Sequence, residues 1–138
     1  KEKFNKLIDE LQLNNNCLLH HTVSNIAEKY CMSSIFVLSS RYEGFGLVLA
    51  EAMTCGIPCV SFDCPHGPSD IIKDYEDGLL VEKENIKELA DKICYLIENE
   101  NVRIKMGHKA RENVKRFLPE NVMPQWKNLF ESLTYSSK

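Results

Sequence analysis

The stretch SSRYEGFGLVLAEAMTCGIP, which runs from Ser39 to Pro58, contains the turn and the helix around which we expect this chain to fold. An apolar run at residues 35–38 precedes it and is typical of a fully buried strand. A polar turn leads into a nearly all-apolar helix at residues 47–55, which the following glycine and proline should stop. A second strand is expected at residues 57–62. This order predicts a right-handed βαβ unit with parallel strands.

Glu51 is the one charged residue of the apolar helix. A carboxylate that is buried there without a partner would cost several kcal/mol, so we expect it to face a polar crevice or to be paired. Glu43 lies in the turn, at the carboxyl end of the first strand, with seven residues between it and Glu51. Both glutamates can therefore border the crevice in which open α/β sheets bind ligands.

Helical and strand-like patterns alternate along the rest of the chain. Apolar spacing predicts helices at residues 2–13, 25–32, 86–97, 102–114 and 122–133, and short strands at residues 17–20 and 79–81. Ser24 or Asn25 is expected to cap the helix at residues 25–32, with Glu28 placed for a capping box, and Asn85 with Glu88 resembles a second capping box. Strands that alternate with helices predict the α/β class, with a Rossmann-like parallel sheet and flanking helices.

The composition limits the classes of function. The 138 residues fit one domain, and a net charge of −3 without a basic stripe argues against nucleic acid as a partner. No apolar run approaches the roughly 20 residues of a membrane span. None of the six cysteines forms a Cys-x-x-Cys pair, so we expect reduced cysteines in a cytoplasmic protein.

Three segments resemble the retaining GT-B glycosyltransferases of family 4, also called glycosyl transferases group 1. These segments are EGFGLVLAEAM at Glu43–Met53, GIPCV at Gly56–Val60 and DGLLV at Asp77–Val81, and the similarity covers about residues 17–115. The resemblance implies that residues 1–138 are a single partial nucleotide-sugar-binding domain, with strands three to six of the C-terminal GT-B domain. Because the chain begins without Met, in what reads as mid-helix, we expect it to be part of a longer protein.

The resemblance also implies a donor site on the turn and the helix. Glu43 is the catalytic candidate, through sugar orientation and charge rather than as a nucleophile. The backbone amides of Gly44, Phe45 and Gly46 would contact the donor sugar, and those of Leu47 and Val48 the diphosphate, as helix N-termini do for anions. Glu51 would accept hydrogen bonds from the ribose hydroxyls.

Two further residues are weaker candidates for donor binding. Arg41 could pair with a phosphate, although a solvated turn arginine is an equal alternative. His21, or its neighbour His20, could lie near the nucleobase, or could be an ordinary surface or core histidine. No metal and no cofactor are expected, because GT-B enzymes mostly use helix dipoles and basic side chains in place of a metal.

The implied function is transfer of a hexose from a UDP-sugar to a glycan or lipid-linked acceptor in bacterial polysaccharide or lipopolysaccharide synthesis. The segment DCPHGPSDII, at Asp63–Ile72, is similar to the version found in such transferases. The acceptor would bind a missing N-terminal domain, and the full-length protein would work in the cytoplasm at the inner membrane face, where it would associate peripherally. Alternatives are a non-catalytic sugar-nucleotide-binding module and a GT-B-fold epimerase, against which the EGFGLVLAEAM block argues.

The missing first strands would leave an open sheet edge. An exposed apolar edge is a template for another chain. We therefore expect either that residues 17–20 pair with residues 35–38, or that the chain dimerises through that edge. The resemblance also implies that the family's basic residues, which neutralise the donor diphosphate, lie in the missing part together with the acceptor domain, so the fragment itself should lack turnover.

Overall fold

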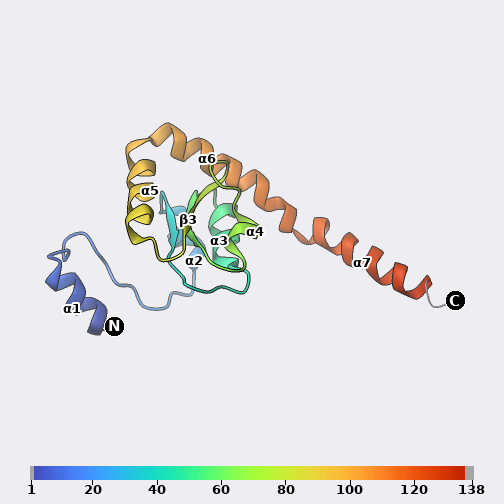
Figure 1. The fold of residues 1–138 in the computed structure, drawn as a ribbon, viewed down its shortest axis with the longest axis horizontal. Helices are drawn as coiled ribbons and strands as arrows, with labels where there is room; N and C mark the ends of the chain where they lie inside the picture. The colour runs from blue at the N-terminus through green and yellow to red at the C-terminus, as the bar shows by residue number, and fades with distance from the viewer. Residues whose placement is uncertain (1, 136–138) are drawn as a thin grey trace.

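The computed structural model describes residues 2–135 and places a small parallel sheet between helices (Figure 1). The elements in chain order are α1 (Glu2–Glu10), α2 (Ile26–Cys31), β1 (Phe36–Leu38), α3 (Leu47–Thr54), β2 (Cys59–Asp63), α4 (Pro68–Ile71), β3 (Gly78–Glu82), α5 (Ile86–Glu98), α6 (Glu100–Asn113), the 3-10 turn η1 (Val114–Phe117) and α7 (Pro119–Tyr135). The predicted α/β class with flanking helices is confirmed.

The sheet has the order β1-β2-β3, and both pairings are parallel. Residue 36 pairs with residue 59, and residue 59 pairs with residue 78. The predicted βαβ unit is therefore present, with α3 as its crossover. The central strand β2 is buried on both faces, but β1 is only partly buried, with Val37 38% exposed. The prediction of a fully buried strand at residues 35–38 was wrong, because this strand lies at the edge of the sheet.

Two hydrophobic clusters cover the two faces of the sheet. One cluster contains Cys59 of β2 together with buried residues of α3, α4 and the end of α6. The other contains Val60 and Phe62 of β2 together with residues of α5 and the middle of α6. Since successive side chains of a strand point to opposite faces, α3 and α5 pack on opposite sides. Both faces of the sheet are thus covered, as parallel sheets require.

Residues 17–20 form no strand, so the predicted strand there and its pairing with residues 35–38 were wrong. These residues lie in an extended segment between α1 and α2, and Leu18 is 78% exposed. A strand needs a partner for its backbone groups, and within residues 2–135 none lies beside this segment. Dimerisation through the open edge of β1 stays a prediction.

The predicted helix starts are correct in part. Asn85 accepts a hydrogen bond from the backbone N–H of Glu88 at 3.2 Å, and its amide donates to the Glu88 carboxylate at 2.9 Å. Asn25 lies at the start of α2 but makes no side-chain capping bond. At α5 the Asn85 side chain caps the Glu88 N–H, but the Glu88 carboxylate contacts the Asn85 side chain instead of its backbone N–H, so only one of the two capping-box bonds is formed. At α2 neither bond from Asn25 is formed.

The first and last helices extend away from the sheet (Figure 1). Helix α1 buries no residue. Helix α7 begins at Pro119, a favourable first position for proline, and exposes several large apolar side chains: Met123, Trp126, Leu129, Phe130 and Leu133. No helix within residues 2–135 is long and apolar enough to cross a membrane.

Candidate functional site

Helix α3 begins at a left-handed glycine that no side chain caps. Gly46 has φ 88° and ψ 47°, a conformation that favours glycine. Its carbonyl accepts the first turn bond, from the Leu49 N–H at 2.8 Å. The first turn of α3 carries no acidic residue. An uncapped helix start presents free N–H groups and the positive end of the helix dipole, which together favour an anion.

The loop before α3 is held by two neighbours. Gly67 approaches so closely that a Cβ atom at this position would lie 2.3 Å from the Phe45 carbonyl oxygen. In addition, the Phe45 ring meets the Phe117 ring edge-on, with centroids 5.4 Å apart and planes at 88°. The N–H of Gly67 donates to the Asp70 carboxylate at 3.3 Å, which ties the neighbouring loop to α4. The backbone of the loop is therefore packed rather than free.

Glu51 lies on the exposed side of α3, although most of its helix neighbours are apolar. The buried residues of the helix are Leu49, Ala52 and Met53, while Glu51 is exposed. The Tyr30 hydroxyl donates a hydrogen bond to its Oε2 at 3.1 Å. The expectation that Glu51 is paired is thus correct, and its carboxylate is exposed because α3 packs on the sheet with one face only, in spite of its apolar sequence.

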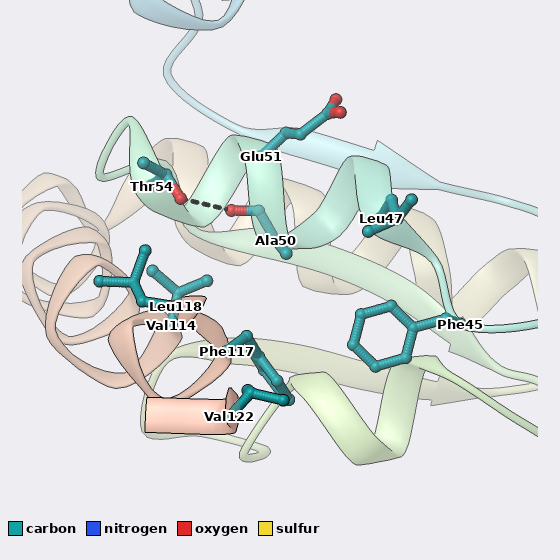
Figure 2. A pocket seen from close by; sticks show the side chains of 9 residues that line it. All are labelled: Phe45, Leu47, Ala50, Glu51, Thr54, Val114, Phe117, Leu118 and Val122. Atoms are coloured by element: carbon teal, nitrogen blue, oxygen red, sulfur yellow. Dashed lines mark hydrogen bonds between the residues drawn. The ribbon is translucent and has the colours of Figure 1, made fainter. Parts of the chain in front are cut away.

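A groove of about 470 Å³ runs beside α3 (Figure 2). It is lined by Phe45, Leu47, Ala50, Glu51, Thr54, Val114, Phe117, Leu118 and Val122. The lining is almost entirely apolar, and Figure 2 shows that the Glu51 side chain points to the opposite side of α3 from Phe117 and Val122. The groove itself offers few polar partners to a phosphate or a ribose. The main polar group among the lining residues, the Glu51 carboxylate, points away from the apolar wall formed by Phe117 and Val122.

The other predicted site residues do not line the groove. Glu43 is half-buried, and its side chain makes no hydrogen bond or ion pair within residues 2–135. Arg41 forms an exposed ion pair with Glu84, with Nε 2.9 Å from Oε1. His21 lies exposed in the segment before α2. The structure therefore brings Gly44–Val48 and Glu51 together along one loop and helix, while Arg41 is already engaged by a carboxylate.

Two supporting residues did not emerge from the sequence as part of the site. Tyr30 was assigned only to a short helix, although the need of Glu51 for a partner was a signal for a donor somewhere in the chain. Gly67 lies in the segment Asp63–Ile72, whose sequence alone does not connect it with Phe45. Its close approach to the Phe45 carbonyl depends on tertiary packing, which no local pattern reports.

The chain matches the family model for glycosyl transferases group 1 over residues 1–113. This chain belongs to the glycosyl transferases group 1 family. This group 1 chain is 38% identical over 133 residues to the poly(ribitol-phosphate) alpha-N-acetylglucosaminyltransferase of Staphylococcus aureus (strain COL). The aligned region covers 96% of this chain and 27% of that protein. The family expected from the sequence motifs is thereby confirmed.

Solved structures show the same fold. An S. aureus TarM mutant in complex with fondaparinux, alpha-GlcNAc-glycerol and UDP gives a TM-score of 0.88 at 37% identity, over 94% of this chain and 27% of that chain. The C-terminal domain of a glycosyl transferase group 1 family protein (LpcC) from Francisella tularensis gives a TM-score of 0.73 at 26% identity, over 84% of this chain and 60% of that chain. The group 1 chain thus has the α/β fold of GT-B glycosyltransferases and spans about a quarter of the length of its S. aureus relatives.

Proposed function

We propose that this chain forms part of the nucleotide-sugar-binding domain of a retaining glycosyltransferase. The enzyme would transfer a hexose from a UDP-sugar to a glycan or lipid-linked acceptor in bacterial cell-surface polysaccharide synthesis. One observation carries this proposal: helix α3 has an uncapped N-terminus, and it carries the exposed carboxylate of Glu51 one turn further on. Membership of the family and the presence of UDP in a TarM complex support the choice of donor.

The two features of α3 suit the two polar parts of a nucleoside diphosphate. The amides of Leu47 and Val48 lie in the uncapped first turn and can donate to diphosphate oxygens, where charge grows as the glycosidic bond breaks. Glu51 follows one turn later, at about 1.5 Å of rise per residue, and its carboxylate can accept from both hydroxyls of a ribose diol. One helix therefore holds the leaving group and orients the nucleoside.

The loop before α3 would receive the sugar. The backbone N–H groups of Gly44, Phe45 and Gly46 would donate to sugar hydroxyls, and Glu43 would orient the ring near the anomeric carbon. The transfer would involve no metal and no cofactor. The rest of the diphosphate charge would be balanced by the helix dipole and by basic side chains elsewhere in the protein, since Arg41 is already paired with Glu84. Acceptor binding is assigned to a further domain, and the site of action to the cytoplasmic face of the membrane.

Calorimetric binding of UDP, GDP and ADP to the full-length protein tests the donor assignment. We expect a preference for UDP, and a loss of UDP affinity of about ten- to a hundredfold in Glu51→Ala, because hydrogen bonds to a charged group are worth about 1.5–3 kcal/mol. Glu98→Ala, which removes an exposed carboxylate at the end of α5, serves as the matched control and should bind normally. Equal binding of UDP by wild type and Glu51→Ala would refute the ribose assignment.

A transfer assay tests the reaction. We expect hexose transfer from a UDP-sugar to an added glycan or lipid-linked acceptor, with retention of the anomeric configuration. Interconversion of UDP-sugars without an acceptor would instead identify an epimerase. Tight binding of UDP-sugars without either reaction in the full-length protein would identify a binding module.

A further inference from the structure

Tyr30 is a buried side chain that reaches an exposed carboxylate of the candidate donor site. The residue is 5% exposed, and its ring stands edge-on to Phe36, with centroids 5.6 Å apart and planes at 76°. It belongs to the same hydrophobic cluster as the buried residues of α3. Its hydroxyl donates to Oε2 of Glu51 at 3.1 Å, across 21 positions of sequence. A rigidly packed donor therefore contacts a carboxylate that is otherwise exposed to solvent.

The phenol stays a donor over the whole neutral range. Burial, and then the hydrogen bond and charge of Glu51, raise the pKa of Tyr30 to about 12. The bond occupies one acceptor position of the carboxylate, which has about four. The remaining positions are directed away from Tyr30 and stay available to another partner.

We propose that Tyr30 is a positioning residue, which holds the Glu51 carboxylate in the orientation that receives the ribose hydroxyls of the donor. This inference rests on the proposed function and adds a residue to it. An exposed glutamate loses much side-chain freedom when it is fixed for binding. Tyr30 fixes one end of that side chain before the ligand arrives, so less freedom remains to be lost on binding.

A purely structural role makes a different prediction. A buried hydroxyl needs an acceptor, and Glu51 could simply be that acceptor. Loss of the hydroxyl would then disturb the packing of α2 on α3 and weaken every nucleotide to the same extent. Positioning through Glu51 instead weakens only ligands that offer ribose hydroxyls.

The test compares Tyr30→Phe with wild type for binding of UDP and of 2′,3′-dideoxyuridine diphosphate by the full-length protein. Tyr30→Phe keeps the ring against Phe36 and removes only the hydroxyl. We expect a three- to tenfold loss of UDP affinity, the range that follows from fixing about one flexible side chain, and no change for the dideoxy ligand. Tyr95→Phe, on α5, is the matched control, because the Tyr95 hydroxyl makes no side-chain hydrogen bond within residues 2–135. This control should bind both ligands as wild type does.

A double-mutant cycle with Glu51→Ala identifies the route of the effect. Once Glu51 is absent, Tyr30→Phe should cause no further loss of UDP affinity. A persisting loss, or an equal loss for both ligands, would overturn the inference in favour of a structural role. If Glu51→Ala weakens UDP binding while Tyr30→Phe does not, the inference fails and the proposed function stands. If Glu51→Ala leaves the preference for UDP over the dideoxy ligand intact, the ribose assignment fails, and the inference fails with it.

Discussion

Gly107→Ala sets a gain in helix propensity against a steric clash, and the structure predicts that the clash dominates. Gly107 lies inside α6, where alanine is intrinsically favoured over glycine by about 0.8–1 kcal/mol. However, a Cβ atom at this position would lie 2.2 Å from the Gly56 carbonyl oxygen and 3.3 Å from Cδ of Pro58. Ordinary carbon–oxygen contacts are about 3.3–3.6 Å, so α6 and the end of α3 would have to separate by roughly 1 Å.

The size of the effect follows from these two opposing terms. Overpacking typically costs 1–3 kcal/mol, and we take about 3 kcal/mol because a backbone oxygen cannot rotate away as a side chain can. After the helix gain is subtracted, Gly107→Ala should lower the free energy of unfolding by about 2 kcal/mol. For a domain of this size, this corresponds to a fall in Tm of roughly 6–10 °C.

Urea unfolding, followed by circular dichroism, measures this difference. The control is His108→Ala, at an exposed position one residue further along α6, which should stabilise the protein by a few tenths of a kcal/mol through helix propensity alone. If Gly107→Ala stabilised the protein by about 1 kcal/mol, then the close approach between α6 and Gly56 would not exist, and the reasoning would be refuted.

Three further changes follow from the same structure. Gly67→Ala should lower the free energy of unfolding by about 2–4 kcal/mol, because the backbone φ of 93° is unfavourable for alanine and the added Cβ would meet the Phe45 carbonyl. Gly44→Ala is the control: a Cβ atom there would have no neighbour within 4 Å, so the free energy of unfolding should change by under about 0.5 kcal/mol. Asp77→Ala should cost about 2–4 kcal/mol in urea unfolding, because this buried carboxylate accepts two hydrogen bonds. Glu76→Ala, at the exposed neighbouring position, should cost clearly less, and equal losses would contradict the burial argument. The pKa of Tyr30 is raised from about 10 in the unfolded chain to about 12 in the folded protein, so its contribution to stability is complete below pH 10 and is lost as the pH rises to about 12. Urea midpoints should therefore fall more between pH 10 and 12 in wild type than in Tyr30→Phe.

Local patterns were sufficient to predict the central βαβ unit. The helix stop at Gly56 is realised in the structure, where α3 ends at Thr54 and Gly56 adopts φ 77°. The strand predicted at residues 57–62 is found at Cys59–Asp63, and the strand predicted at residues 79–81 is found at Gly78–Glu82. These segments carry their own signals, because a glycine that ends a helix and a short apolar strand are each recognisable within about ten residues.

Residues 17–20 show where local patterns are insufficient. The run is short and apolar, as a buried strand would be, but periodicity alone does not indicate whether a neighbouring strand is present. Beside this segment the structure describes no strand, and the backbone remains in an extended connection. The backbone hydrogen bonds that define a strand belong to a pair of segments, so a single segment cannot specify them.

In the candidate site, too, some features can be recognised from the local sequence and others depend on tertiary packing. The turn and the carboxylate of Glu51 are visible in the sequence, but the groups that hold α3 in place come from distant segments. Gly67 approaches the loop at the start of the helix, and Gly107 approaches Gly56 just beyond its end. Both contacts are between backbones, so no flexible side chain can absorb a displacement. Helix α3 is therefore held at both ends, and Glu51 owes its position to contacts that lie up to about fifty residues away in the chain.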